Sequence, residues 1–496
     1  MQSLTVSPLR LLALATCATT LALLIVACKS SSPSSDMTAA APASITCAAA
    51  GSNAKNPTAP TSIDATCAQL PFTPATQAGG DGGKKQITNQ QAADMYSWLS
   101  FVAVNWPANT ATCTPDTTKT ILTNPSSPTW LTWTSPTQIF KASGAPDPWC
   151  GGTAAPTAGA LSATQQNQIA RLPLAVRKIA TAHPEITLYL SHSSKSEDLT
   201  SAVPILLKGS STPDPLKEVL QSTDRPIIDQ NGRFARYSVV VGHDEYNFIA
   251  NNALYTKSGQ TKNGPATFPS SDPTTGNQGG LELKAAWKVM GPGDNPANFY
   301  TQQAIVYNDQ SGEPSPIDHG IVTVGLISLH IIHKAANQAV WTWATFEQES
   351  NTTTSFFNPH CVPPTKLLGN DCIPNQPTAG PNAQELSPTG KPLQFPTQIT
   401  VKPYSTVTGD DYNAAFQTLL AGTAWAHYKL VSTQWLSGAT GLVPQFMAST
   451  VQETFVPKLT SSGQTLDGCG SCHRFANDAV NQPADFSFLL SHAQQK

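Results

Sequence analysis

The chain has 496 residues, a formal charge of -3 and 12% charged residues, so it carries no basic excess of the kind that binds nucleic acid. Its 41 prolines, 32 glycines and 10 cysteines are typical of an exported protein with long ordered loops. The length allows a large core, and we expect no nucleic-acid partner.

An apolar run near the N-terminus indicates export. It covers residues 11–27 after Arg10, is too short and too rich in Ala and Thr for a permanent membrane span, and is typical of a signal peptide. Residues 24–28 read LIVAC and resemble the lipobox of bacterial lipoproteins, in which the cysteine is acylated. We therefore predict a lipoprotein signal peptide over residues 1–27 and a lipid anchor at Cys28, with an ordinary secretory signal as the alternative.

The residue after Cys28 bears on location. In the sorting pattern of Gram-negative lipoproteins an Asp here favours the inner membrane, and this chain has Lys29. The sequence thus favours an outer membrane lipoprotein on the periplasmic side. No second run is long and apolar enough to span a bilayer, so we expect membrane contact through the lipid alone.

Ser, Thr, Ala, Pro and Gly dominate residues 28–86. Such a segment buries too little apolar surface to offset its ordering entropy, so we predict a flexible tether. A bridge between Cys47 and Cys67 would fix part of it.

The rest of the chain predicts an α+β fold, with an antiparallel sheet body over residues 87–400. Thr88 and Gln91 form a capping-box pattern ahead of a helix that ends at Asn105-Trp106-Pro107. Further helices are expected at 162–181, 411–424 and 444–455. Strands are expected at 234–249, 281–290, 299–307, 320–333 and 340–346. No helix-length insert separates the last four, which favours antiparallel pairing with flanking helices on one face. Long Pro/Gly-rich loops are expected at 257–280 and 351–398.

Six cysteines remain once Cys17, Cys28 and the C-terminal pair are set aside. An oxidising compartment lets them pair. Proximity in the sequence suggests Cys47 with Cys67, Cys113 with Cys150, and Cys361 with Cys372, although other connectivities are open.

Near the C-terminus, Cys469-Gly470-Ser471-Cys472-His473 form C-x-x-C-H, the attachment signature of a c-type haem. Two thiols at this spacing can each bond one vinyl group of the porphyrin, and the adjacent imidazole then lies under the iron as an axial ligand. We therefore predict one covalent haem c held by Cys469, Cys472 and His473.

Other uses of a C-x-x-C pair have less support. A thioredoxin-like dithiol needs a helix and further strands after the motif, whereas 23 residues follow His473. A zinc site needs a second ligand pair, and none lies nearby in the sequence. A disulfide between Cys469 and Cys472 would be strained.

The sequence leaves the sixth iron ligand open. No Met lies downstream of the motif, so the alternatives are Met447, His427, His492 or an open, water-bound position. The short downstream segment also means that the haem must take its apolar wall from elsewhere. Residues 485–490 and the helices expected between 411 and 455 would supply it, in a small helical haem-binding region at 401–496 packed on the body. Arg474 could neutralise a propionate or lie exposed.

His330 and His333 would share one face of a helix and could then bind a metal together. The surrounding residues read as a strand, so we expect the two imidazoles on opposite faces of the sheet. Glu347 follows an aromatic strand, and we interpret it as a buried, paired carboxylate, with acid/base work as the alternative.

Several of these segments together resemble a family of exported bacterial proteins known as cytochrome c family proteins. The likeness rests on Trp98 with residues 105–107, on 284–287, 325–334 and 341–347, on the haem motif and on the 485–490 tail. The resemblance implies a single covalent haem and no established substrate. The family pattern departs after Glu347, where a His and an Asp-Asn pair are replaced by residues 348–351.

Three functions follow as hypotheses. The first is a lipid-anchored monohaem c-type cytochrome that transfers electrons to or from a redox partner protein. The second is a haem-dependent oxidoreductase with an open iron site, since the body is larger than a simple carrier needs. The third is a surface binding module in which the haem is structural.

Overall fold

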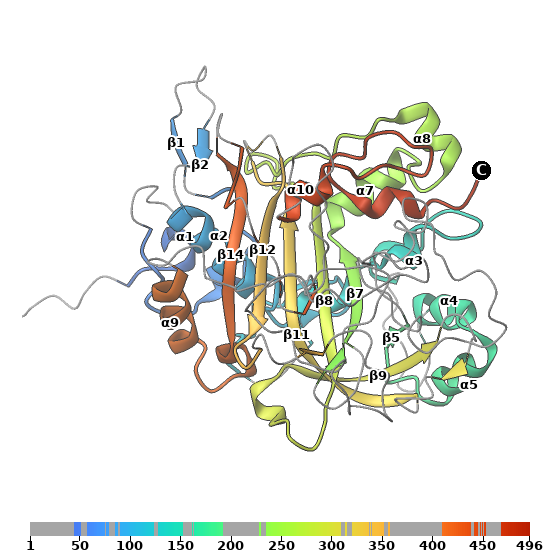
Figure 1. Ribbon diagram of the computed structural model, residues 1–496, viewed down its shortest axis with the longest axis horizontal. Coiled ribbons are helices and arrows are strands. Elements are labelled where there is room, and N and C mark those ends of the chain that lie inside the picture. Colours follow the sequence, from blue (N-terminus) through green and yellow to red (C-terminus); the bar gives the residue numbers. More distant parts are fainter. Residues whose placement is uncertain are drawn as a thin grey trace, which may run out of the picture. The chain divides into compact units, whose positions relative to one another are not determined.

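The strands of one open sheet organise the molecule (Figure 1). The computed structural model describes residues 44–50, 57–74, 76–78, 85–87, 90–123, 127–151, 161, 163–191, 228–229, 235–308, 313–314, 320–336, 338, 340–351, 356–357, 409–437, 441–444, 447, 449, 451–452 and 468–496. The signal segment 1–27, the predicted anchor Cys28 and the predicted pair Cys361 and Cys372 lie outside these residues.

Among the described residues, nine strands form the main sheet, and short pairs of strands form three small ones. The main strands are β5 (Leu188–Leu190), β7 (Arg236–Val241), β8 (Leu281–Val289), β9 (Thr301–Asn308), β10 (Glu313–Pro314), β11 (Ile321–His333), β12 (Thr342–Gln348), β14 (Tyr428–Ser437) and β15 (Gly441–Val443). The small pairs are β1 (Thr76–Ala78) with β2 (Lys85–Ile87), β3 (Ala108–Asn109) with β4 (Thr114–Pro115), and β6 (Ile228–Asp229) with β13 (Phe356–Phe357).

The central strands run β7-β8-β11-β12-β14-β15, each antiparallel to its neighbour. Figure 1 shows β7, β8, β11, β12 and β14 side by side. Strand β9 pairs with the first residues of β11, and β5 joins β9 in parallel. The predicted α+β class with an antiparallel sheet is therefore confirmed, as are the four strands predicted between 281 and 346.

One face of the sheet is apolar and is covered by helices. Helix α2 (Gln90–Val104) packs there with α9 (Gly409–Leu419), and 13 residues of α2 are buried. The Trp98 ring stacks on Phe416 at 4.8 Å and meets Phe346 of β12 edge-on at 5.0 Å. Its indole N–H donates to Asn413 at 3.0 Å, so the largest apolar residue of α2 also fixes the helix pair.

Two predicted elements differ in the structure. The strand predicted over 234–249 ends at Val241, and α7 (His243–Asn251) follows, because Gly242 caps a first turn that carries Asp244 and Glu245. The helix predicted over 162–181 is two helices, α4 (Ala163–Arg171) and α5 (Leu174–Ala182). Pro173 lies between them and supplies no backbone N–H.

Other helices are short. The helix predicted at 411–424 is α9 followed by the 3-10 turn η7 (Ala424–His427), and the loop predicted at 257–280 contains α8 (Lys257–Asn263). The remaining short helical elements are α1 (Cys47–Ala50), η1 (Ala65–Ala68), η2 (Thr129–Thr132), α3 (Pro136–Ile139), η3 (Trp149–Gly151), η5 (Pro296–Asn298), α10 (Cys469–His473) and η9 (Phe488–His492).

The helix predicted over 444–455 is wrong at the positions described there, which are not helical. Side chains of the sheet bond to the backbone of this segment instead. Gln434 donates its amide to the Pro444 carbonyl at 2.7 Å, and the Tyr237 hydroxyl donates to the Val451 carbonyl at 2.8 Å. Pro444 and Val451 therefore lie against the face of the sheet opposite to α2.

The predicted tether over 28–86 is too long, because its later part packs on the body. Cys47, Cys67 and Leu70 are buried in the main core. The Phe72 carbonyl accepts the Ala336 N–H at 2.8 Å and the Ser271 hydroxyl at 2.5 Å. A disulfide between Cys47 and Cys67 helps to offset the entropy that composition alone assigns to this segment.

The boundary predicted at residue 400 does not separate two bodies. Strand β14 pairs with β12 over Trp343 to Gln348, so the predicted haem-binding region 401–496 supplies part of the main sheet. Residues 44–496 form one compact unit.

Two of the three predicted disulfides are confirmed. Cys47 bonds Cys67, and Cys113 bonds Cys150 across 37 residues of sequence.

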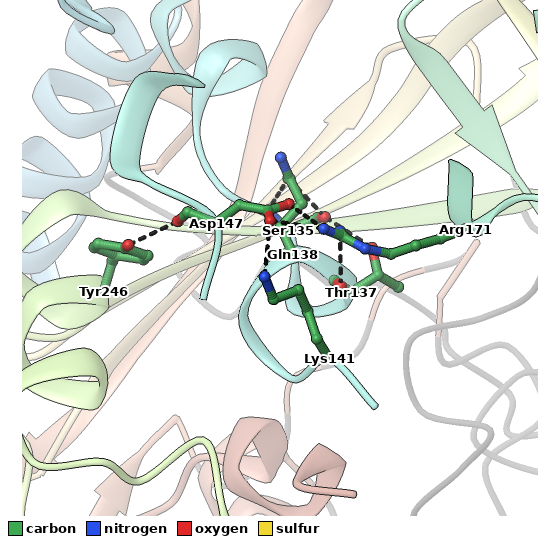
Figure 2. A network of polar contacts seen from close by, with 7 residues as sticks. All are labelled: Ser135, Thr137, Gln138, Lys141, Asp147, Arg171 and Tyr246. Carbon is green, nitrogen blue, oxygen red and sulfur yellow. Dashed lines mark hydrogen bonds and ion pairs between the residues drawn. The ribbon is translucent and has the colours of Figure 1, made fainter. Parts of the chain in front are cut away.

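The buried residue Asp147 connects side chains that follow α3, end α4 and lie in α7 (Figure 2). Asp147 accepts both Arg171 contacts, at 2.5 and 2.6 Å, and a contact from Lys141 at 3.1 Å. The Tyr246 hydroxyl of α7 donates to the Asp147 carbonyl at 2.7 Å. These charges pair with one another, which gives the network a structural role.

Candidate functional site

The predicted haem motif forms the short helix α10, which lies at one end of β12 and β11 (Figure 1). The Gly470 N–H donates to the Gln434 side-chain oxygen of β14 at 2.7 Å. A Cβ atom at Gly470 would lie 2.5 Å from Leu442 Cδ1 and 3.0 Å from Trp343 Cη2. The glycine of the motif therefore allows the helix to approach the sheet more closely than any other residue would.

His473 is buried beside this contact, with 7% of its surface exposed. Its Nδ1 lies 2.7 Å from the carbonyl oxygen of Phe486. A carbonyl oxygen only accepts, so Nδ1 carries the proton and the lone pair of the neutral ring is on Nε2. This tautomer is the one an iron-ligating imidazole needs.

Aromatic rings surround the imidazole. Phe488 meets it edge-on at 5.1 Å, and Trp343 lies at 6.1 Å between ring centres. The wider apolar cluster around it includes Ile332, Met447, Leu489 and Leu490, with Cys469, Leu442 and Phe486 packed against it. The Trp343 indole N–H is buried and has no hydrogen-bond partner among the described residues. The residues present therefore fit a large flat apolar group with polar edges.

The structure separates the three candidates for the sixth ligand. Met447 is 2% exposed and belongs to the same apolar cluster as Cys469. His492 lies in the same region, with its ring 6.0 Å from Phe140. His427 lies beyond the other end of β14, where it pairs with Glu349 at 2.6 Å. Six strand residues, roughly 20 Å, separate it from the position of Gln434, so the structure does not bring His427 to His473.

The two strand histidines lie on opposite faces of the sheet, as predicted. His333 contacts Tyr96 of α2 through Nδ1 and the Gln278 carbonyl through Nε2 at 2.7 Å. His330 lies on the other face, with Nδ1 2.9 Å from Thr345 Oγ1. Burial lowers the pKa of His333 to about 4, so His333 is a neutral core residue.

On the face of the sheet opposite to α2, side chains of neighbouring strands form rows across the sheet. The first row, nearest to the C-x-x-C-H segment, is Glu282, Ile332, Trp343 and Gln434. Glu282 bonds Ser487 of the C-terminal tail, while Trp343 and Gln434 contact α10. The second row is Lys284, His330, Thr345 and Ser432. All four residues of the second row are buried, and the Ser432 hydroxyl has no partner among the described residues.

Glu347 lies one row further along and is buried, as expected, with its carboxylate accepting the Ser449 hydroxyl at 2.7 Å. Arg474 is exposed, and its guanidinium lies 4.7 Å from the ring of Phe475. The structure therefore places Arg474 at the surface beside the motif, next to a phenylalanine that is 56% exposed.

A pair of buried carboxyls lies behind the C-terminal tail. Glu282 of β8 and Glu245 of α7 are 7% and 0% exposed. Burial raises the pKa of Glu245 well above its usual range, and the neighbouring Glu282 raises it further. Burial also raises the pKa of Glu282, so the surroundings disfavour two charged carboxylates at this place.

Several of these residues were not predicted from the sequence. Gln434 and Ser487 carry no signal that separates them from ordinary strand and loop residues. Glu282 and Lys284 do, because they interrupt an apolar strand that is buried on both faces. Within the part of the chain that the structure describes, no group of three or more His, Cys, Asp or Glu side chains is arranged to hold a metal ion.

Comparisons with protein-family models, with characterised proteins and with solved structures find no match to this chain. No helix among the described residues is both long enough and apolar enough to cross a membrane.

Proposed function

We propose that this chain is an exported, lipid-anchored monohaem c-type cytochrome that transfers electrons to or from a partner protein. The observation that carries the proposal is the contact between His473 Nδ1 and the Phe486 carbonyl, inside an aromatic wall built from β12 and the C-terminal tail. This contact holds the histidine in the tautomer that binds iron through Nε2. A C-x-x-C-H sequence that arose by chance would not require it.

Each residue has a defined part in this proposal. Cys469 and Cys472 would hold the porphyrin by thioether bonds, and His473 Nε2 would bind the iron. A haem bound here would supply one-electron redox chemistry. One side of the imidazole is covered by the aromatic rings of Trp343, Phe486 and Phe488. Such an apolar cover excludes water and favours the less charged redox state of a group bound to the imidazole.

In this proposal Met447 would supply the second protein ligand to the iron. Its burial in the same cluster as Cys469 supports this role, and a thioether needs no deprotonation to bind iron. Replacing Met447 with Ala should open the position, so that the reduced protein binds carbon monoxide. The unsubstituted protein should not bind it, and His492→Ala serves as the comparison for the competing ligand.

Cys28 would carry the lipid and place the protein at the periplasmic side of the outer membrane. Arg474 and Phe475 form an exposed polar and apolar pair directly after the motif, which supports this edge as the approach of a redox partner. With a net charge of -3, the chain lacks the positive charge that would attract a nucleic acid, and the proposal includes no such partner.

The test is covalent haem itself. Protein produced in a host competent in cytochrome c maturation should retain a haem stain after denaturing electrophoresis. Cys469→Ala with Cys472→Ala should abolish the stain. Cys47→Ser with Cys67→Ser is the matched control, because it removes two other cysteines and should leave the stain intact. A haem-free unsubstituted protein from that host would refute the proposal.

A second candidate is a haem-dependent oxidoreductase, and the second row favours it. One row beyond the aromatic wall, the sheet carries a continuous line of buried polar side chains, which are Lys284, His330, Thr345 and Ser432. A simple electron carrier needs only apolar side chains at such buried positions. Such a line could bind a small polar substrate. High-spin iron that binds carbon monoxide in the unsubstituted protein would favour this candidate over electron transfer.

A further inference from the structure

The carbonyl that faces His473 belongs to an unusual turn. Asp485 and Phe486 are consecutive non-glycine residues with positive φ angles of 48° and 69°. The left-handed conformation is unfavourable for a residue with a Cβ atom and persists where its surroundings hold it.

Contacts from the body fix the first residue of the turn. The Asp485 carboxylate pairs with Lys334 at the end of β11 and accepts the Phe268 N–H at 2.8 Å. The Trp341 indole N–H donates to the Asp485 carbonyl at 2.7 Å. Both the side chain and the backbone of Asp485 are therefore bonded.

Ser487 fixes the other side of the turn. Its hydroxyl is buried and donates to Glu282 of β8 at 2.5 Å. Glu282 is the second residue of β8, and the first, Leu281, donates its N–H to Glu245 of α7 at 2.6 Å. The acceptor of Ser487 therefore lies where β8 is bonded to α7.

The Phe486 carbonyl lies between these two attachments and points to His473 Nδ1. We infer that Ser487 and Glu282 are positioning residues that hold this carbonyl against His473 and so set the electron-donor strength of the ligand. The inference rests on the proposed haem function. A hydrogen bond from Nδ1–H makes the imidazole a stronger donor, and a stronger donor stabilises the oxidised iron.

Loss of the positioning contact should therefore raise the midpoint potential. For Ser487→Ala and for Glu282→Met we expect about a tenfold shift of the equilibrium toward the reduced form, which equals about 59 mV for one electron. Glu282→Gln retains a side-chain oxygen that can accept from Ser487, so its potential should remain close to that of the unsubstituted protein.

The experiment is spectroelectrochemical titration of the full-length holoprotein, together with haem content and thermal unfolding of each variant. Ser97→Ala is the matched control. It removes another buried serine hydroxyl, which bonds Thr433 at 2.6 Å from α2 on the opposite face of the sheet. A purely structural role for Ser487 would lower the unfolding temperature, as in the control, without moving the potential.

Because Ser487 also caps η9, Ser487→Ala alone could fail to fold. The comparison of Glu282→Met with Glu282→Gln then decides, since both keep the size of the side chain. Unchanged potentials in the folded, haem-loaded variants would overturn the inference and leave the proposed function intact. Absence of haem in the unsubstituted protein would overturn the proposed function instead.

Discussion

Single buried side chains hold the C-terminal tail on the sheet. Lys334 and Asp485 form a pair in which the side chains are 5% and 12% exposed. The pair connects the end of β11 to the turn that faces His473, so its strength bears on both the fold and the site. Lys119 and Asp116 form an ion pair of the same chemistry at the surface, where the lysine is 51% exposed.

Lys334→Met should destabilise the protein by about 3 kcal/mol, because it leaves the Asp485 carboxylate buried without its cation. Lys119→Met should change the free energy of unfolding by less than about 0.5 kcal/mol. Denaturant titration of both variants measures the difference. Equal effects would show that burial of the Lys334 pair does not matter.

Two buried groups on α2 and β11 give the stability opposite dependences on pH. Burial lowers the pKa of His333 from 6.5 to about 4, so the unfolded state binds more protons between these values. Burial raises the pKa of Asp94 from 3.8 to about 7, so in that range the folded state binds more protons. The contribution of His333 is lost as the pH falls below 6.5, and that of Asp94 is lost as the pH rises toward 7.

We therefore predict that protonation of His333 in the unfolded state lowers the free energy of unfolding by up to about 3 kcal/mol between pH 6.5 and 4. His333→Gln should abolish this decrease. Asp94→Asn should remove the dependence of opposite sign. Denaturation midpoints across this range, compared with those of the unsubstituted protein, test both. The idea fails for His333 if the two pH profiles are parallel.

Among the elements, α10 depends most on how closely it approaches its neighbours. It has five residues, too few to be stable alone, so its position comes from Gln434, Leu442 and Trp343. The disulfides have a comparable effect on segments with little core of their own. One closes the loop between Cys113 and Cys150, which contains β4, η2 and α3, and the other holds α1 against η1.

Gly470→Val should push α10 from the sheet and cost about 2 kcal/mol through overpacking, because the new side chain would overlap Leu442 and Trp343. Gly293→Val is the control, since a Cβ atom there meets nothing within 4 Å. Thermal unfolding and the haem content per protein should fall in the first variant alone. Equal haem content in both would show that α10 tolerates displacement.

Cys113→Ser with Cys150→Ser should lower the free energy of unfolding by about 4 kcal/mol, as expected for a loop of 37 residues. Peptide mapping without reduction should recover the Cys113–Cys150 and Cys47–Cys67 pairs. It also tests the prediction for Cys361 and Cys372. Mixed pairings in the native protein would contradict the disulfides of the structure.

The C-x-x-C-H segment and the chain around it cannot be removed from the molecule as a separate unit. Strand β14 lies between β12 and β15 in the main sheet, and α9 covers the core beside α2. A polypeptide that ended at residue 400 would expose the edge of β12 and the rings of Trp98 and Phe346. Exposed strand edges and apolar surface lead to aggregation.

Truncation after residue 400 should therefore give insoluble protein, whereas removal of residues 1–43 should leave the fold intact, because residues 44–496 form the compact unit. Solubility and circular dichroism of the two truncated chains provide the measurement. A soluble, folded 44–400 fragment would restore the domain boundary that composition suggests.

The sequence by itself determined the elements whose cause is local. Alternation of β-branched and aromatic residues predicted β8, β9, β11 and β12, and the strand period placed His330 and His333 on opposite faces. The order of the cysteines along the chain predicted both observed disulfides, which join residues 20 and 37 positions apart. The haem, which the sequence predicts from five consecutive residues, stays a prediction.

Only the tertiary structure decided what depends on distant partners. It extended the packed body back to residue 44, replaced the helix expected after Pro444 with a segment bonded to Gln434 and Tyr237, and made β14 part of the sheet. It also brought the Phe486 carbonyl to His473 and Ser487 to Glu282, and left His427 at the far end of β14. These contacts join residues far apart in the chain, and no local pattern encodes which of them will meet.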